Sequence, residues 1–227
     1  MTNKVAVIED NETNIKLIRY QLESEGFDVH IENTGAAGLK MIKKQKPDII
    51  ILDIGLPDID GFEVCRELRN KKATESYPII MLTARGEDHH KVEGLRLGAD
   101  DYITKPYNKE ELILRINNVL KRFKKYKEID GIKRIKDLKI NFSKREVTIK
   151  GKAANLTFSE YQILTLLIDT PGKVHTKKEL NKIIFNISEE VESRTIDTHV
   201  HNLRKKLKNS GSLISTIRSV GYIYNED

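Results

Sequence analysis

The stretch Ile49-Ile50-Ile51-Leu52-Asp53-Ile54-Gly55-Leu56-Pro57 decides the fold of the first half of the chain. Its apolar residues run without polar alternation, which is typical of a strand buried on both faces of a parallel sheet. Gly55 and Pro57 then end the strand, so the carboxylate of Asp53 stands at its carboxyl end. Open α/β sheets bind ligands at that end. A lone acid there could equally cap a helix or form a turn.

The composition predicts two packed domains of different charge. The 227 residues, 38% of them hydrophobic, suffice for two ordinary domains with packed cores. Residues 1–122 hold 19 basic and 21 acidic residues, a net charge of −2, whereas residues 123–227 hold 21 basic and 13 acidic, a net charge of +8. A near-neutral module therefore precedes a basic one, of the kind that binds a polyanion.

Several classes of protein are excluded. No apolar run reaches membrane-spanning length and no basic and apolar leader opens the chain, so we expect a cytoplasmic protein with no membrane partner. The single cysteine, Cys65, excludes an internal disulfide and a cysteine-cluster metal site. We interpret it as a small buried apolar residue.

Residues 1–122 alternate strand and helix patterns. Strands are expected at 4–8, 27–31, 49–53, 78–82 and 102–103, and helices at about 15–22, 35–42, 62–68, 92–97 and 109–124. This alternation predicts an α/β doubly wound, five-stranded parallel sheet with right-handed crossovers. The carboxyl ends of its strands would bring together Glu9, Asp10, Asp53, Thr83 and Lys105.

These side chains suit phosphoryl transfer onto a carboxylate. Acids this close raise one another's pKa unless a cation offsets them, and oxygen ligands favour Mg²⁺ over zinc. Asp53 would attack as the nucleophile, Lys105 and the metal would neutralise the phosphoryl oxygens, and Thr83 would donate a hydrogen bond. The structural alternatives are a partly buried ion pair between Asp53 and Lys105 and a helix N-cap at Thr83.

This half resembles the receiver domain of response regulators of the OmpR/PhoB family, through Glu9-Asp10, residues 53–61, Leu82-Thr83-Ala84 and residues 98–107. The resemblance implies that a sensor histidine kinase phosphorylates Asp53. It also implies that Mg²⁺ is held by Glu9, Asp10, Asp53 and the backbone carbonyl of Gly55. Slow self-dephosphorylation is expected, but not the activity of a metabolic enzyme.

Further roles follow from the same resemblance. Thr83 and Tyr102 would form a switch pair, and Lys105 and Pro106 a cis peptide bond. Without the motif, Tyr102 would be an ordinary half-buried aromatic. A symmetric dimer of the phosphorylated receiver is implied by three pairs: Lys91 with Glu111, Asp101 with Arg115, and Asp100 with Arg122. The alternative for this face is a solvated surface, and Arg96 and Asn117 depart from the family pattern, so the dimer is expected to be weaker.

Residues 123–136 lose the apolar period and are rich in charge, which predicts a solvated linker with Gly131 as its most flexible point. Residues 137–227 then predict a smaller α+β winged helix-turn-helix domain. It would have a hairpin over 138–149, helices near 158–168, 180–185 and 191–207, and a second hairpin over 214–224. In the third helix, Ile196, Val200, Leu203 and Leu207 share a core face.

The opposite face of that helix is polar and suits a DNA major groove; the alternative is a solvated helix surface. Residues 134–224 resemble the winged-helix effector domain of the same family, notably in residues 194–200, 203–207 and 217–222. The resemblance implies a DNA-binding set that comprises Arg194, Thr195, His199, His201, Asn202, Arg204 and Arg218. Thr195, His199 and Arg204 would touch phosphates, and Arg218 would enter the minor groove. His201 and Asn202 replace two arginines common in the family, and Ser219 replaces a glycine, so we expect readout shifted toward A·T pairs and a shallower salt dependence.

The leading hypothesis is a transcription regulator whose phosphorylation at Asp53 promotes receiver dimerisation and binding of double-stranded DNA. Its expected partners are the sensor histidine kinase and a second copy of the chain, with RNA polymerase as a further candidate. A phosphatase or nucleotide-binding enzyme is one alternative, but Gly55 replaces a second catalytic acid and no phosphate-binding glycine motif is present. Another is a DNA-binding protein whose receiver dimerises without phosphate.

Overall fold

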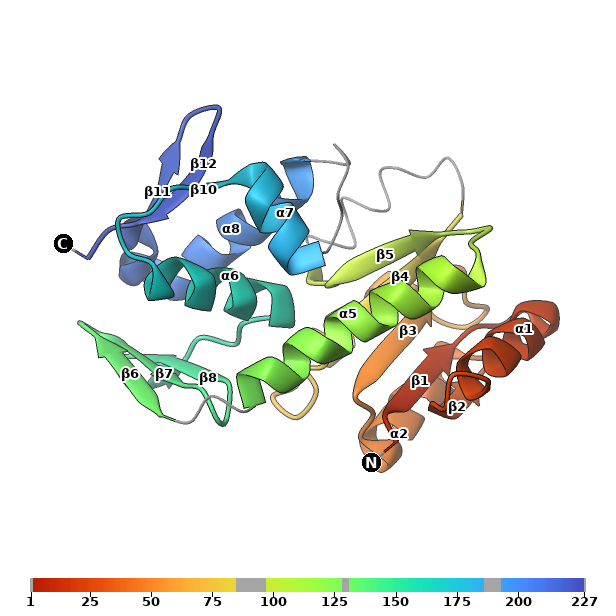
Figure 1. Ribbon diagram of the computed structural model, residues 1–227. Coiled ribbons are helices and arrows are strands. Elements are labelled where there is room, and N and C mark those ends of the chain that lie inside the picture. The colour runs from red at the N-terminus through yellow and green to blue at the C-terminus, as the bar shows by residue number, and fades with distance from the viewer. Residues whose placement is uncertain (1, 85–96, 128–130, 186–192, 227) are drawn as a thin grey trace. The chain divides into compact units, whose positions relative to one another are not determined.

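Figure 1 shows a computed structural model of the chain. The structure describes residues 2–84, 97–127, 131–185 and 193–226, with side chains for all of these except residues 122–127, 185 and 193–195. The chain divides into two compact units, Met1–Leu120 and Lys121–Asp227. No helix in the described part of the chain combines the length and the apolar character needed to cross a membrane.

The first unit is a parallel sheet covered by helices on both faces. Its strands are β1 (Lys4–Ile8), β2 (Asp28–Glu32), β3 (Ile49–Asp53), β4 (Ile79–Thr83) and β5 (Asp101–Thr104), in the order β2-β1-β3-β4-β5 with every pair parallel. The helices are α1 (Glu12–Glu23), α2 (Gly35–Gln45), α3 (Gly61–Arg69) and α5 (Lys109–Lys127). The predicted five-stranded fold is confirmed, whereas most of the helix predicted at 92–97 lies outside the described residues.

Burial follows the position of each strand in the sheet. The central strands β3 and β4 are buried at every residue, and the edge strand β2 is only half-buried. Helices α2 and α3 pack on one face of the sheet, against residues that include Ala6, Ile50 and Leu52, and Figure 1 shows α1 and α5 on the other. Cys65 on α3 is fully buried in this core, where burial raises the pKa of its thiol to about 11.

The loop after β3 is held by its own acidic side chains. Asp60 caps α3, accepting from the backbone N–H of Phe62 at 2.7 Å. The carboxylate of Asp58 accepts from the first two N–H groups of α2, on Gly35 at 2.8 Å and Ala36 at 2.9 Å. The hydrogen bond from Ala36 is the main cause that lowers the pKa of Asp58. These bonds fix the backbone immediately after Asp53.

The second unit consists of two small antiparallel sheets and three helices. The first sheet has the order β6-β7-β8-β9, and the second has the order β10-β12-β11. The elements are β6 (Ile132–Ile135), β7 (Leu138–Asn141), β8 (Glu146–Ile149), β9 (Lys152–Ala153), α6 (Phe158–Asp169), β10 (His175–Thr176), α7 (Lys177–Phe185), α8 (Ser193–Leu207), the 3₁₀ helix η1 (Lys208–Leu213), β11 (Ile214–Ile217) and β12 (Gly221–Tyr224). Within this unit, α6 lies between the first sheet and the layer of α7, α8 and the β11–β12 hairpin, which we call the wing (Figure 1).

The helices of this unit begin and pack as their sequences predict. Thr157 and Glu160 form a capping box at the start of α6, with both reciprocal hydrogen bonds present. The predicted core face of α8 is confirmed, because Ile196, Val200, Leu203 and Leu207 are all buried. The fold is therefore a winged helix-turn-helix domain.

The structure differs from the predicted solvated linker at residues 123–136, because it has regular secondary structure at both ends of that range. Residues 123–127 continue α5, and Ile132–Ile135 form β6, which pairs with β7. Residues 123–127 are phenylalanine, lysine and tyrosine, which can continue a helix without an apolar period, because helix propensity does not require one. Gly131 has φ +130, a left-handed value that glycine adopts readily, and precedes β6 directly. The second unit therefore includes a strand that the predicted boundary at residue 137 leaves out.

Replacing Gly61 by alanine should destabilise the first unit. A Cβ at Gly61 would lie 2.2 Å from the backbone oxygen of Asp53 and 2.8 Å from Cα of Ile54, neither of which can move without shifting the strand. We expect Gly61→Ala to lower the free energy of unfolding by about 1–3 kcal/mol, measured by urea denaturation. Gly55→Ala is the control, because a Cβ there meets nothing within 4 Å. Equal stability of Gly61→Ala and Gly55→Ala would contradict this packing.

Candidate functional site

The three acids predicted to meet at the sheet edge do so. Glu9 follows β1 and is fully buried, Asp53 ends β3 and is nearly buried, and Asp10 is exposed. One carboxylate oxygen from each lies within 4.8 Å of the others. Neighbouring parallel strands produce this cluster, because β1 and β3 pair directly and their carboxyl ends coincide.

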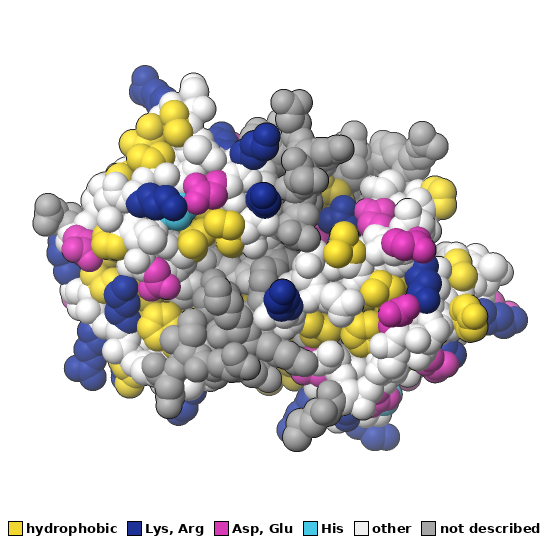
Figure 2. Space-filling view, viewed as in Figure 1, with side chains coloured by type: hydrophobic (Ala, Val, Ile, Leu, Met, Phe, Trp, Pro, Cys, Tyr) yellow, Lys and Arg dark blue, Asp and Glu magenta, His cyan; other side chains and the backbone are white. Residues whose placement is uncertain are grey.

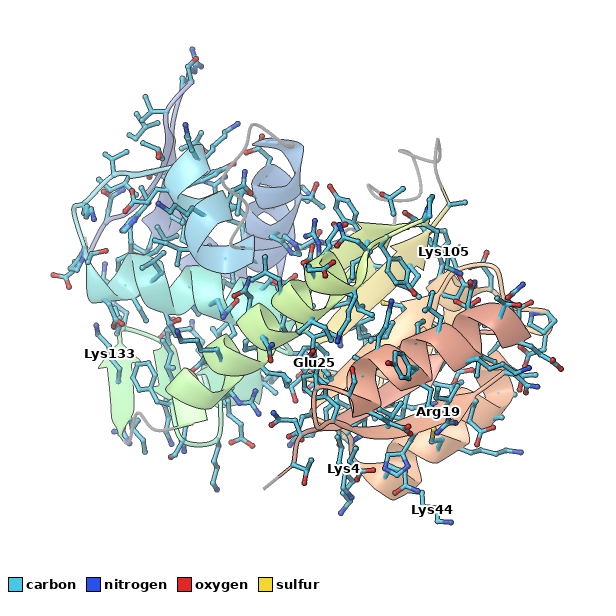
Figure 3. All side chains as sticks on the ribbon, turned by 45° about the vertical axis from the view of Figure 1, so that its right-hand side comes forward. Lys4, Arg19, Glu25, Lys44, Lys105 and Lys133 are labelled. Carbon is cyan, nitrogen blue, oxygen red and sulfur yellow. The ribbon has the colours of Figure 1, made fainter. Side chains whose placement is uncertain are left out.

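Lys105 lies between two of these carboxylates. Its Nζ is 2.7 Å from Oε2 of Glu9 and 2.8 Å from Oδ2 of Asp53. Figure 3 shows Lys105 at the end of the sheet, beyond β5. The Lys105–Pro106 peptide bond is cis, as the resemblance implied. Burial has the largest single effect on the ammonium and lowers its pKa, but the hydrogen bonds and charges of Asp53 and Glu9 together raise it above the ordinary value.

Asn14 is a site residue that the sequence analysis missed. Its Nδ2 donates to Oε1 of Glu9 at 2.9 Å, and the backbone N–H of Asn11 approaches the same oxygen at 3.4 Å. The only signal in the sequence is a polar residue in the first turn of α1, four positions after Asp10. Both oxygens of Glu9 thus accept from protein donors, whereas Asp10 faces solvent.

The cluster fits a hard divalent cation. Three carboxylates and one ammonium leave a formal charge of −2, and all available ligand atoms are oxygens, which Mg²⁺ prefers. A cavity of about 450 Å³ adjoins Asp53, lined by residues 53–56, Asp60, Ala84 and Lys105. The backbone of Gly55 lies at this cavity with open space where a Cβ would be. Asp10, Asp53 and the Gly55 carbonyl could hold the ion, with Glu9 beside it.

The predicted switch residues lie on neighbouring strands. Thr83 ends β4 and is 1% exposed, and its hydroxyl has no hydrogen-bond partner among the residues that the structure describes. Tyr102 on β5 is half-buried and packs partly against the core. Tyr107 lies near the cluster as well: burial, followed by the charges of Glu9 and Asp53, raises the pKa of its phenol.

The predicted dimer face needs a correction. Asp100 is 1% exposed and pairs with Arg69 on α3 at 2.9 Å, so its carboxylate is not available at the surface for Arg122. Asp101 binds Arg115 within the chain, through two contacts of 3.0 Å, and Glu111 also binds Arg115 at 3.0 Å. The sequence analysis did not predict Arg69 as the partner of Asp100, because the packing of α3 brings the two residues together. Lys91 and the side chain of Arg122 lie outside the described residues.

The polar face of α8 is narrower than predicted. His199 is fully buried, which contradicts its expected phosphate contact. It lies three residues after Ile196 and four before Leu203, so it joins the core stripe of the helix. The side chains of Arg194 and Thr195 lie outside the described residues.

Two cations of α8 are engaged within the chain. Arg204 donates to the carbonyl of Ile214 through Nε at 2.9 Å and Nη2 at 2.6 Å, instead of extending freely toward a phosphate. Lys206 lies 2.7 Å from Oε2 of the buried Glu160. His201 and Lys205 remain exposed on α8, with Asn202 half-buried beside them.

The wing presents an exposed tip. Arg218 is its only cation and lies in the turn between β11 and β12, next to Ile217 and Val220, which are 37% and 42% exposed. Figure 2, viewed as Figure 1, shows dark blue and yellow side chains together at the upper end of the β11–β12 hairpin, so cationic and apolar side chains gather there. Ser219 adopts φ +61 in the turn, the left-handed value for which the family commonly has glycine.

The basic charge of the second unit lies mostly away from α8. Residues 131–155, which include β6 to β9, hold 8 basic and 2 acidic residues, a net charge of +6 out of the +8 of residues 123–227. The charge asymmetry of the sequence therefore does not by itself locate a DNA contact.

Two family models match the chain. The response regulator receiver domain matches residues 5–117, and the C-terminal domain of transcriptional regulatory proteins matches residues 151–224. The phosphate regulon transcriptional regulatory protein PhoB of Rhizobium meliloti is 38% identical over 224 residues, 98% of each chain. The alkaline phosphatase synthesis transcriptional regulatory protein PhoP of Bacillus subtilis is 38% identical over 237 residues, covering 100% of this chain and 98% of its own.

Solved structures agree on the fold. A RitR mutant aligns with a TM-score of 0.83 over 99% of this chain and 100% of its own, and its 23% identity shows the fold alone. The response regulator DrrB, a Thermotoga maritima OmpR/PhoB homologue, is 32% identical over 99% of this chain and 100% of its own, with a TM-score of 0.51. The receiver domain of sensor histidine kinase PA1611 from Pseudomonas aeruginosa was solved with a magnesium ion in its active site cleft. It is 29% identical over 53% of this chain and 99% of its own, with a TM-score of 0.50.

A receiver domain followed by a transcriptional regulatory domain, with relatives that match along nearly the whole length, describes a transcription regulator rather than a metabolic enzyme. The chain belongs to the OmpR/PhoB family of response regulators.

Proposed function

We propose that Asp53 accepts a phosphoryl group from a sensor histidine kinase and that this modification controls binding of the second unit to promoter DNA. The observation that supports this most is the position of the Asp53 carboxylate. It lies beside a cavity, 2.8 Å from the Lys105 ammonium and within 4.8 Å of oxygens of Glu9 and Asp10. A structural ion pair would need only one carboxylate for one lysine, whereas here Lys105 contacts two carboxylates and the third, Asp10, lies beside them.

In the proposed reaction, an oxygen of Asp53 forms a bond to the phosphorus while the bond from phosphorus to the donor's histidine nitrogen breaks. The electron pair of that bond stays with the imidazole. Lys105 is placed to neutralise the negative charge on the phosphoryl oxygens. The buried hydroxyl of Thr83 would then donate to one of these oxygens.

Mg²⁺ is the proposed cofactor, held by Asp10, Asp53 and the carbonyl of Gly55, with Glu9 beside it. When bound, it supplies positive charge to the phosphoryl oxygens. The donor set of the cluster and the magnesium ion in the PA1611 receiver domain support this assignment.

Slow self-dephosphorylation follows from the lining of the cavity. Apart from Asp53, its only carboxylate among the described residues is Asp60, whose Oδ1 accepts from the N–H of Phe62 as the cap of α3. Asp10, the exposed acid beside Asp53, would be occupied by Mg²⁺ when the ion is bound. An attacking water would then have only weak general bases beside it, so we expect hydrolysis of the phosphoryl group to be slow.

The proposed output is a receiver dimer that places two winged helices on neighbouring half-sites. Phosphorylation would draw the Thr83 hydroxyl toward the new group and let Tyr102 turn inward. Because Asp101 already binds Arg115 within one chain, dimer formation would have to exchange this pair or use Glu111. Two modest DNA contacts joined in a dimer bind more tightly than either alone. RNA polymerase is a further candidate partner.

Replacing Asp53 should abolish phosphorylation. We expect Asp53→Asn to show no mass gain of one phosphoryl group after incubation with acetyl phosphate and Mg²⁺, measured by intact-protein mass spectrometry, because the amide is a poor nucleophile. Asp58→Asn is the matched control, since Asp58 caps α2 and does not line the cavity, and it should still be labelled. Labelling of Asp53→Asn at another residue would refute the site.

Replacing Lys105 should destabilise the first unit in a pH-dependent way. Without Mg²⁺, Lys105→Met leaves the buried Glu9 and Asp53 without a cation, at a cost of about 3 kcal/mol in unfolding free energy. The raised pKa of Lys105 means that its contribution is fully present below pH 10.5, the ordinary lysine value, and is lost as the pH rises through the folded-state pKa. Urea denaturation from neutral to alkaline pH tests this. The exposed Lys16→Met is the control, and a difference that grows at alkaline pH would be the wrong sign.

Asn202 should influence which DNA sequence is bound. Because arginine reads guanine and asparagine suits adenine, Asn202→Arg should tighten binding and change the preferred site, measured by selection from random duplexes. Lys139→Arg, at an exposed position of β7 outside α8 and the wing, adds a guanidinium without changing charge and should leave the preferred site as it is. An unchanged site preference in Asn202→Arg would argue against base reading by this residue.

A further inference from the structure

A group of polar contacts joins α8 to the base of the wing, at the edge of the hydrophobic core to which Ile214 and Tyr222 belong. Oδ1 of Asp197 on α8 accepts from the hydroxyl of Tyr222 on β12 at 2.5 Å. Oδ2 of the same carboxylate lies 2.7 Å from Nζ of Lys177, the first residue of α7. One carboxylate therefore binds both the wing and the helix that precedes α8 in the helix-turn-helix.

Arg204 makes a second connection on the same side of α8. It lies seven residues, or two turns, after Asp197. Its guanidinium donates to the carbonyl of Ile214 and, through Nη2 at 2.9 Å, to the hydroxyl of Thr216, both on β11. It also lies over the ring of Tyr222, 5.4 Å from the centroid. Asp197 and Arg204 thus hold both strands of the wing.

These contacts are poorly suited to a purely stabilising role. The side chains of Asp197 and Lys177 are 41% and 29% exposed, so water can replace much of what their ion pair contributes to stability. By contrast, the side chains of the wing from Thr216 to Val220 are all exposed and none belongs to the hydrophobic core. The carbonyl of Val220 accepts from the backbone N–H of Lys177 at 3.1 Å, at the base of the wing. The direction of its tip therefore depends on the contacts at its base.

The hydroxyl of Tyr222 is a reliable donor in this arrangement. Its ring is 5% exposed, and burial, followed by the hydrogen bond to Asp197, raises the pKa of the phenol. It therefore keeps its proton at neutral pH.

We infer that Asp197 and Arg204 are positioning residues for DNA binding: they fix the angle between α8 and the wing, so that α8 and Arg218 engage one duplex together. The inference rests on the proposed DNA-binding function and assigns these two side chains to the wing rather than to DNA. Two contacts held at a fixed angle act as one linked site, whereas a wing free to pivot would lose most of the benefit of its own contact.

A double-mutant cycle on DNA affinity tests the inference with the full-length chain. Tyr222→Phe removes only the hydroxyl and keeps the ring, and Arg218→Ala removes the cation at the tip. The probe is a duplex selected with the wild-type protein from a random library. We expect Tyr222→Phe to weaken binding about fivefold, and Arg218→Ala to weaken binding clearly in the wild type but less than about twofold in the Tyr222→Phe background. Losses that simply multiply, or no loss in Tyr222→Phe, would overturn the inference.

Matched variants separate positioning from folding. Tyr224→Phe removes the hydroxyl of the other tyrosine on β12, which has no hydrogen-bond partner in the described part of the chain, and should leave DNA affinity unchanged. Asp197→Asn keeps an acceptor for Tyr222 and should bind DNA more tightly than Asp197→Ala. Urea denaturation of each variant should show similar stability for Tyr222→Phe and Tyr224→Phe. A stability loss that accounts for the whole affinity loss would also overturn the inference.

Failure of the inference is distinguishable from failure of the proposed function. If Arg218→Ala binds the duplex as tightly as the wild type, the wing does not contact DNA and the proposed function loses this element. If Arg218→Ala weakens binding by the same factor with and without the Tyr222 hydroxyl, DNA binding stands and only the positioning role is refuted.

Discussion

The ammonium of Lys105 between Glu9 and Asp53 is the interaction on which the first unit depends. Pairing of β1 with β3 brings two carboxylates to one edge of the sheet, and their repulsion would open that edge without a cation between them. Lys105 arrives from β5, which is separated from β3 by β4. The ends of β1, β3 and β5 therefore share one balance of charge, with the end of β4 between the last two.

In the second unit, helix α8 has three sides with different surroundings. The core side of α8 is buried, the side with Asp197 and Arg204 faces the wing, and the remaining exposed side includes His201 and Lys205. The side of α8 proposed to contact DNA is thus the one that stays exposed after the fold has used the other two sides. Most of the unit's positive charge lies elsewhere, so this side is defined by geometry more than by charge.

Long side chains account for several differences between expectation and structure. Arg69, Arg204 and Lys206 each bind a group 10 to 46 residues away in sequence. Such partners depend on which helices pack together, and a guanidinium that looks free on a helical wheel can reach a carbonyl on another element. The buried pair of Asp100 with Arg69 removes one predicted dimer contact in the same way.

The sequence alone determined the succession of strands and helices in the first unit and the acids at the strand ends. It also determined the capping box at Thr157 and the apolar face of α8. Periodicity and local hydrogen bonding act over a few residues, so they can be read from the sequence. Only the tertiary structure decided that His199 is buried, that α5 runs to Lys127, that Ile132–Ile135 form a strand, and that Arg204 holds the wing. These features depend on the width of a buried stripe and on contacts between distant segments, which packing settles and local pattern does not.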